Sequence, residues 1–394
     1  MYGQTLPQPS NTSQAPTVTP LTSNSGVAAL GLENTPSGLW SGGVFLGSEE
    51  SNFLIQGNKA STPYCENENR AFDDFKPDHS FHALKDRLTR YAAAHSRAVK
   101  MSEWISENIP YSALKKINLQ SLRSDLETCG SFLIFRHFFT INTVKLAGMC
   151  SCHRHLLCPL CAIRRAAKSV KAYLDRFNVL QAENQNMRPY LVTFTVKDGE
   201  NLTERFDHLQ NSLRLYYSHR RKALSSKSRH LPNEACKALG GVGSFEVKRG
   251  SGSGMWHPHA HFIWLCNTPP DKGTLQQEWH TLTGDSFIVD VTPFHEGKNV
   301  SEGFLEVFKY ALKTSTMEHS DNWEAFLVLK GRRLVSSFGI FRNVEVPEQL
   351  TDDFDESDLP FIEMIFRYLK GVYLLDSQKQ VIPSTSQQAS ERSE

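Results

Sequence analysis

The segment of the chain with the clearest chemical pattern is residues 257–261, which read His-Pro-His-Ala-His and lead into the apolar residues 262–265. This pattern predicts a buried β-strand. Because side chains alternate between the two faces of a strand, His257, His259 and His261 share one face. Imidazole is a common ligand of divalent metals, so the pattern favours a metal site. The alternative is a polar cleft lined by histidines that bind no metal.

The spacing of the three histidines limits which of them can hold one ion. Residues i and i+2 lie about 6.6 Å apart along a strand, and residues i and i+4 lie about 13 Å apart. One ion can therefore bridge His259 and His261, or His257 and His259, but hardly the outer pair. His261 lies well inside the predicted strand, whereas His257 borders a loop. We therefore favour His259 and His261 as ligands and His257 as a substrate contact.

A carboxylate on the preceding strand is the expected third ligand, because Mg²⁺ and Mn²⁺ prefer oxygen ligands beside imidazole. Residues 242–247 predict a strand, and the Gly/Ser-rich residues 250–254 join it to the histidine strand as a hairpin. Glu246 lies on the polar face of the first strand, and this can be the histidine face. The alternative is an exposed strand carboxylate with no ligand.

A helix predicted over residues 301–314 carries a second set of reactive groups. Glu306 and Tyr310 are four residues apart, as are Lys309 and Lys313, so each pair stacks on one helical face. A tyrosine hydroxyl beside a metal can attack phosphorus and form a phosphotyrosine. A carboxylate one turn away can then activate the water that hydrolyses this ester. Taken alone, Tyr310 would be a packing residue, but beside metal-binding histidines it is the candidate nucleophile.

A third pattern is a group of four cysteines within twelve residues, namely Cys150, Cys152, Cys158 and Cys161. Residues 158–161 read Cys-Pro-Leu-Cys, which is typical of one half of a zinc site. The other two ligands have alternatives: they can be Cys150 and Cys152, or one of these cysteines with His153 or His155. In an intracellular protein such a cluster indicates metal rather than disulfides, so we expect a structural Zn²⁺. Reduced free thiols are the alternative.

The charge of the chain is unevenly distributed. The net charge of the 394 residues is +1, yet residues 81–344 contain 36 Lys and Arg against 23 Asp and Glu. A basic core between acidic flanks favours a polyanionic partner such as DNA. Candidate contacts to DNA or phosphate are His257, Lys309, Lys313, Arg164 and Arg165. No apolar run reaches the roughly 20 residues that cross a membrane, and no signal pattern begins the chain, so we expect a cytoplasmic protein without membrane contact.

Three blocks of the sequence resemble the plasmid rolling-circle replication initiators of the HUH endonuclease superfamily, in the single-tyrosine branch that pairs a Glu with the Tyr. The blocks are residues 191–196, His259-Ala260-His261 and residues 306–313, and a later stretch over 331–339 is also similar. The resemblance covers about residues 80–345. Ala260 is small where bulkier residues are common in the family.

The resemblance implies a reaction for these residues. Tyr310 would nick one strand at the replication origin, keep the 5′-phosphate as a phosphotyrosine and leave a 3′-OH that primes synthesis. Glu306 would act as base for the water that ends the round. Mg²⁺ or Mn²⁺ would be held by His259, His261 and an acidic ligand, which we place at Glu246.

The order of predicted elements indicates an α+β fold with a central antiparallel sheet flanked by helices. We predict strands over 132–135, 191–196, 242–247, 257–265 and 286–291, and helices over 83–99, 112–126, 162–181, 203–223, 301–314 and 361–375. The predicted organisation is a disordered tail over 1–75, a helical and Cys-rich zinc region over 80–185, an HUH catalytic domain over 186–345, an acidic segment with a terminal helix over 346–375, and a disordered tail over 376–394.

The expected partners are plasmid origin DNA, single-stranded or as an extruded hairpin, together with a host helicase and polymerase. A relaxase or transposase of the same superfamily would share the metal and tyrosine chemistry. A zinc-containing DNA-binding regulator without catalysis is the alternative from another class.

Overall fold

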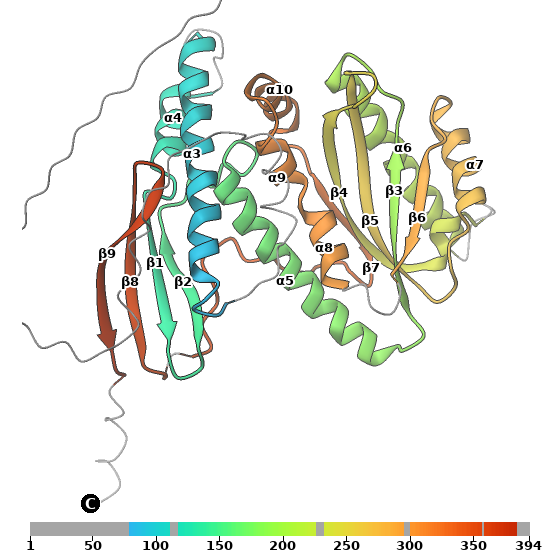
Figure 1. The fold of residues 1–394 in the computed structure, drawn as a ribbon. Helices are drawn as coiled ribbons and strands as arrows, with labels where there is room; N and C mark the ends of the chain where they lie inside the picture. Colours follow the sequence, from blue (N-terminus) through green and yellow to red (C-terminus); the bar gives the residue numbers. More distant parts are fainter. Residues whose placement is uncertain (1–78, 111–116, 226–231, 295–299, 357, 384–394) are drawn as a thin grey trace, which may run out of the picture. The chain divides into compact units, whose positions relative to one another are not determined.

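The computed structural model describes residues 79–110, 117–225, 232–294, 300–356 and 358–383 (Figure 1). Within these ranges the chain forms helices and two antiparallel sheets, so the α+β prediction is confirmed. The tail predicted over 1–75 lies outside the described residues. None of the described helices combines the length and apolar character needed to cross a membrane.

The five-stranded sheet has the strand order β6-β3-β5-β4-β7, and every neighbouring pair is antiparallel. Its strands are β3 (Arg188–Thr195), β4 (Ala238–Arg249), β5 (Trp256–Cys266), β6 (Val289–Pro293) and β7 (Val335–Gly339). The histidine strand is β5, in the centre of the sheet. Its predicted hairpin partner is β4, and the two strands pair over their whole length.

The two faces of this sheet carry different side chains. One face is apolar and aromatic, with Phe194, Phe262 and Trp264 fully buried against α6 (Leu202–Ala223) and α7 (Lys272–Thr283). The opposite face carries the histidines and is contacted by α8 (Val300–Phe308) and α9 (Tyr310–Ser315). The remaining elements in this part of the chain are the 3₁₀ turn η2 (Glu234–Lys237) and α10 (His319–Leu329).

The helix predicted over 301–314 is divided into α8 and α9 by a turn at Lys309. Backbone hydrogen bonds continue across the turn, because Lys309 N donates to Leu305 O and Lys313 N donates to Lys309 O, both at 2.9 Å. The side chain of Ser244 on β4 donates to the carbonyl of Val307. This bond fixes the end of α8 to the histidine face of the sheet.

The four-stranded sheet has the order β2-β1-β8-β9. It consists of β1 (Phe132–Phe138), β2 (Thr143–Met149), β8 (Phe361–Leu369) and β9 (Val372–Val381), and it lies beside α3 (Leu84–Asn108) and α4 (Leu119–Thr128) in Figure 1. The long helix α5 (Pro159–Glu183) contacts α3 in this region and α8 beside the five-stranded sheet.

The terminal helix predicted over 361–375 is wrong, because this segment forms the β8–β9 hairpin. The spacing of the apolar residues in β8 is compatible with both a helix and a strand. The turn that follows them distinguishes the two. Lys370 and Gly371 both have positive φ values, 49° and 92°, and such a pair closes a tight hairpin. Strand β9 also includes residues 376–381, which the sequence predicts to belong to the C-terminal tail. Residues 384–394 lie outside the described residues.

Candidate active site and metal centres

The β4–β5 register places the predicted metal ligands on one face of the sheet. Glu246 lies opposite His259, Ser244 lies opposite His261 and Lys248 lies opposite His257. Directly opposed residues of an antiparallel pair point to the same side. The hairpin therefore brings Glu246 to the histidine face, as the hairpin prediction required.

The three side chains converge within ligand distance. Nε2 of His259 lies 3.3 Å from Oε1 of Glu246, and Nε2 of His261 lies 3.6 Å from Oε2 of the same carboxylate. One ligand atom from each residue lies within 4.8 Å of the others. The carboxylate is almost fully buried, with 2% of its side chain exposed.

The other ring nitrogens orient the two imidazoles. Nδ1 of His259 donates to the carbonyl of His257 at 3.3 Å, and Nδ1 of His261 is hydrogen-bonded to Oγ1 of Thr193 at 2.9 Å. These contacts direct both Nε2 atoms to Glu246. Nε2 of His261 is buried and has no hydrogen-bond partner among the residues that the structure describes. A buried, unsatisfied imidazole nitrogen beside a carboxylate fits a divalent metal, whose histidine ligands are commonly held through the other nitrogen.

The protonation states also suit metal binding. Burial alone would raise the pKa of Glu246, but the two neighbouring imidazoles and the charge of Lys313 hold it well below its usual range. Burial lowers the pKa of His259, and this effect exceeds the opposing effect of Glu246. The site thus offers a charged carboxylate and a neutral imidazole near neutral pH, which are the forms that bind metal.

Helices α8 and α9 add a second carboxylate and an ammonium group to the site. Nζ of Lys313 lies 2.8 Å from Oε2 of Glu246 and 2.9 Å from Oε1 of Glu306. Nζ of Lys309 lies 3.6 Å from the other oxygen of Glu306. Burial would raise the pKa of Glu306, but the charge of Lys313 lowers it. Glu306 is therefore ionised at neutral pH and can accept a proton.

Tyr310, the predicted nucleophile, is buried at the start of α9. Burial raises the pKa of its hydroxyl, and the charge of Arg165 on α5 opposes this rise. Among the residues that the structure describes, no hydrogen bond joins Tyr310 to Glu246, His259 or His261. The hydroxyl is thus protonated near neutral pH, and the side chain is buried.

His257 has a partner that sequence reasoning missed. Its Nδ1 lies 2.5 Å from Oδ1 of Asp198, and the other oxygen of this carboxylate accepts a hydrogen bond from Ser253 at 2.5 Å. Asp198 follows β3, and an isolated bridge between Gly199 and Trp256 brings it to the start of β5. No local spacing relates residues 198 and 257, so only the sheet topology could reveal this pair.

The four-cysteine cluster consists of Cys129, Cys152, Cys158 and Cys161. Sγ of Cys129 lies 3.5 Å from the sulfurs of Cys158 and Cys161, and Cys152 lies 3.6 Å from Cys161. Tetrahedral zinc with Zn–S bonds of about 2.3 Å separates its sulfurs by a little under 4 Å. The cluster therefore fits Zn²⁺, and three of its four predicted ligands are brought together.

Cys150 is replaced by Cys129 in this cluster, which corrects the predicted set. The β1–β2 pairing places Leu133 opposite Met149, so the residues before β1 lie beside those after β2. The amide of Gly130 donates to the carbonyl of Cys150 at 2.7 Å, and the amide of Cys152 points to Sγ of Cys129. Cys150 thus contributes its backbone, and Cys129 contributes the thiol.

The backbone around Cys129 is held by two further groups. The hydroxyl of Tyr373 on β9 donates to Gly130 O at 2.6 Å, and Nδ1 of His95 on α3 donates to Cys129 O at 2.5 Å. Gly130 has a φ of 76°, and a Cβ atom here would lie 2.4 Å from Leu160. Sγ of Cys161 lies within hydrogen-bond distance of the sulfurs of Cys129 and Cys152, and hydrogen bonds with the neighbouring thiols lower the pKa of Cys161. One thiolate is therefore favoured even before a metal binds.

Comparison with known proteins identifies the family. A family model described as "Replication protein" matches residues 143–364, which is more than half of the chain. The chain belongs to this replication protein family. The family consists of rolling-circle plasmid replication initiators with nicking activity, so the resemblance inferred from the sequence is confirmed. No curated protein and no solved structure matches the chain.

The match relates the initiator family to the site just described. It begins in β2 and ends in β8, and it includes the histidine strand, Glu246, Glu306 and Tyr310, but not Cys129. A replication initiator binds origin DNA, which agrees with the basic core of the chain. The match also includes the acidic segment after β7, which contains Asp352.

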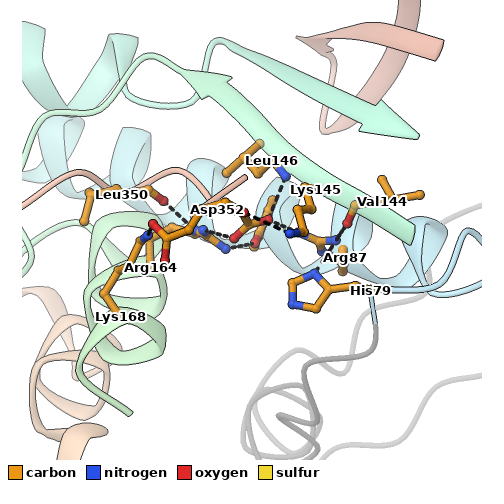
Figure 2. A network of polar contacts seen from close by, with 11 residues as sticks. His79, Arg87, Val144, Lys145, Leu146, Arg164, Lys168, Leu350 and Asp352 are labelled. Carbon is orange, nitrogen blue, oxygen red and sulfur yellow. Dashed lines mark hydrogen bonds and ion pairs between the residues drawn. The ribbon is translucent and has the colours of Figure 1, made fainter. Parts of the chain in front are cut away.

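Asp352 in this acidic segment forms the centre of a buried polar network (Figure 2). Its carboxylate binds Arg87 at 3.2 Å and Arg164 at 2.5 Å, and it accepts a hydrogen bond from the amide of Leu146 at 2.7 Å. Burial would raise the pKa of Asp352, but the charges of Arg164 and Arg87 hold it well below its usual range. The network joins α3, β2 and α5 to the acidic segment.

The predicted phosphate contact of Arg164 is corrected by this network. The guanidinium is buried, and it also donates to Leu350 O at 2.7 Å and to the hydroxyl of Tyr91 at 3.2 Å. An arginine held in this way cannot bind DNA without breaking the core. Arg165 is half-buried and donates to Pro347 O at 2.9 Å, so its role as a DNA contact stays a prediction.

Proposed function

We propose that this initiator nicks one strand of its plasmid origin, with Tyr310 as nucleophile and with Mg²⁺ or Mn²⁺ held by His259, His261 and Glu246. One observation carries the proposal. Two buried imidazole Nε2 atoms and a charged, buried carboxylate converge on one point, and Nε2 of His261 has no hydrogen bond there. Such an arrangement is costly unless a ligand occupies it.

In the proposed reaction the Tyr310 oxygen forms a bond to the scissile phosphorus, and the bond from phosphorus to the 3′-oxygen breaks. The hydroxyl loses its proton, and the departing 3′-oxygen gains one. The products are a 5′-phosphotyrosine and a 3′-OH that primes synthesis. The metal supplies charge that offsets the negative charge developing on the phosphate. Because Tyr310 is buried beside α5, its hydroxyl must become accessible when DNA binds.

Glu306 is proposed as the base that ends the reaction. It is ionised, it is half-buried, and it lies on the helix that precedes Tyr310. In hydrolysis it would accept the proton of the water that attacks the phosphotyrosine, and the tyrosine oxygen would leave with a proton. Lys313 holds Glu306 in place through its contact at 2.9 Å. Lys309, Lys313, Arg165 and His257 remain proposed contacts to DNA.

The four-cysteine cluster is proposed to hold a structural Zn²⁺. Its four sulfurs leave no open position for a substrate, and a closed tetrahedral set of this kind stabilises folds rather than catalysing reactions. The cluster is joined through the Cys129 and Gly130 carbonyls to α3 and β9. The further partners proposed are single-stranded or hairpin origin DNA, a host helicase and a host polymerase. The family match favours an initiator over a relaxase or a transposase.

The test is a covalent trapping experiment. Wild-type protein is incubated with a single-stranded origin oligonucleotide and Mn²⁺, and protein–DNA adducts are separated under denaturing conditions. We expect an adduct with the wild type and none with Tyr310→Phe. Equal adduct from both proteins would overturn the assignment of Tyr310, and no adduct from the wild type would overturn the nicking reaction.

The same assay tests Glu306. Glu306→Gln should form the adduct but release it more slowly by hydrolysis. The matched control is Glu302→Gln, an exposed residue one turn earlier on α8, which should release the adduct at the wild-type rate. Equal release rates in the two variants would remove Glu306 from the mechanism.

A further inference from the structure

Lys313 occupies an unusual place between two carboxylates. Its ammonium group lies 2.8 Å from Oε2 of Glu246 and 2.9 Å from Oε1 of Glu306. Oε2 of Glu246 is also the oxygen that faces Nε2 of His261, at 3.6 Å. The ammonium group and the proposed metal therefore use the same carboxylate oxygen.

A buried carboxylate requires a compensating charge. Glu246 is 2% exposed, and the ammonium group of Lys313 lies 2.8 Å from one of its oxygens. In the arrangement described here, Lys313 supplies the positive charge that Glu246 needs. A divalent ion bound to Glu246 would supply that charge instead, and it would repel the ammonium group.

The side chain of Lys313 has room to leave. It is 37% exposed, although both of its carboxylate partners belong to the site. A lysine ammonium sits on a flexible four-carbon stem, so it can release one oxygen and keep another. Glu306 can hold Lys313 after Glu246 has turned to the metal, and the ammonium then lies toward solvent, where a DNA phosphate can approach.

We propose that Lys313 is a counter-cation that competes with the divalent metal for Glu246. It holds the carboxylate in place before the metal binds, and a bound metal would displace it toward the scissile phosphate. The inference rests on the proposed function, because it takes His259, His261 and Glu246 as the metal ligands. It makes Lys313 a positioning residue whose first effect is on metal affinity.

If Lys313 only orients Glu246, removing it should change the metal affinity in the opposite direction. If Lys313 served only to orient Glu246 for the metal, its removal would weaken metal binding. If Lys313 competes with the metal, its removal strengthens metal binding. The direction of the change in the dissociation constant therefore separates the two roles.

The experiment measures Mn²⁺ binding to the full-length protein by titration calorimetry at one pH and one salt concentration. We expect Lys313→Met to bind Mn²⁺ about tenfold more tightly than the wild type, within the range that residues next to metal ligands produce. Lys313→Arg, which keeps the charge, should remain close to the wild type. Lys309→Met is the matched control, because Lys309 contacts Glu306 and should change the affinity less than about twofold.

Three further measurements make the outcome decisive. His261→Ala identifies the binding event that belongs to this site, and its failure to reduce Mn²⁺ binding would overturn the metal site and the inference together. If His261→Ala does reduce Mn²⁺ binding, then unchanged or weaker Mn²⁺ binding by Lys313→Met would overturn the inference and leave the proposed function intact. Lys313→Gln takes the place of Lys313→Met if circular dichroism shows that the latter is unfolded. Tighter metal binding with slower nicking in the same variant would show that the lost activity is not lost metal.

Discussion

Two buried clusters in this initiator each hold a carboxylate among basic side chains. They differ in whether the protein alone satisfies all of their polar groups. Around Asp352, a carboxylate lies between Arg87 and Arg164, and it also accepts a backbone amide. Around Glu246, a carboxylate lies between Lys313 and two imidazoles, and Nε2 of His261 has no hydrogen bond. The first cluster is satisfied by the protein itself, whereas the second converges on a place for a ligand.

The difference shows how to separate structural charge from functional charge. Buried polar groups in folded proteins are nearly always paired, because an unpaired group loses the hydrogen bonds it had with water. A complete network such as that of Asp352 can therefore be explained by stability alone. An incomplete one such as that of Glu246 requires another explanation, and a bound metal provides it. The cysteine cluster is an intermediate case, since its thiols bind each other but have the spacing of a zinc site.

The largest effect is expected from Cys129→Ser. If the cluster holds zinc, this change removes one ligand and with it much of the folding free energy that a structural zinc supplies, which reaches about 10 kcal/mol or more in small domains. We expect loss of zinc, measured by elemental analysis, and a large fall in Tm, measured by circular dichroism. A variant that keeps one zinc per chain would place Cys129 outside the ligand set.

Asp352→Asn should be the next most severe change. It leaves two buried guanidinium groups without their carboxylate, and removal of one partner from a buried ion pair costs about 3–5 kcal/mol. The free energy of unfolding at pH 7, measured by urea titration, should fall by this amount. Asp175→Asn is the control: Asp175 pairs with Lys171, and both side chains are 61% exposed, so the loss should stay below about 1 kcal/mol.

Acid provides an independent measure of the same cluster. The folded-state pKa of Asp352 lies well below its ordinary value of 3.8, so its contribution to stability is complete above that value. The contribution is lost as the pH falls below 3.8 toward the folded-state pKa. Between pH 5 and pH 2 the wild type should therefore lose more stability than Asp352→Asn. Parallel curves for the two proteins would contradict the role of this carboxylate.

His261→Ala should change activity far more than stability. The imidazole is a proposed metal ligand. Its removal costs the fold the Nδ1 contact with Thr193, whereas Nε2 has no hydrogen-bond partner among the described residues. We expect nicking to fall by about 100-fold or more, because the metal offsets charge in the transition state, while Tm changes by only a few degrees. His208→Ala is the control, since His208 pairs with Asp285 outside the site and should nick normally. A large fall in Tm with His261→Ala would mean that this histidine has a structural role, as Asp352 does.

Sequence alone was sufficient where the geometry is local. The two-residue period of a strand placed His259 and His261 on one face, and the short loop before β5 made Glu246 their neighbour, as the register confirms. It was insufficient where distant segments meet. Asp198 reaches His257 through a bridge between strands, and Cys129 reaches Cys152 through the β1–β2 pairing. No spacing along the chain encodes either contact.

The terminal hairpin shows a different limit of sequence reasoning. Phe361, Met364, Ile365 and Tyr368 follow the spacing of an amphipathic helix, yet they belong to β8. The spacing of these four residues does not distinguish a helix from a strand. The pairing of β8 with β1 and β9, and the tight turn at Lys370 and Gly371, identify the strand.

The smallest effect is expected from Cys150→Ser, and it tests the ligand set most sharply. One backbone hydrogen bond, from the amide of Gly130 to the carbonyl of Cys150, joins the segments that carry Cys129 and Cys150. Serine keeps that carbonyl, so zinc content should remain at one per chain and stability should change by no more than about 0.5 kcal/mol. If Cys150→Ser loses zinc while Cys129→Ser retains it, the ligands are the four closely spaced cysteines, and the pairing of β1 with β2 must differ at this end.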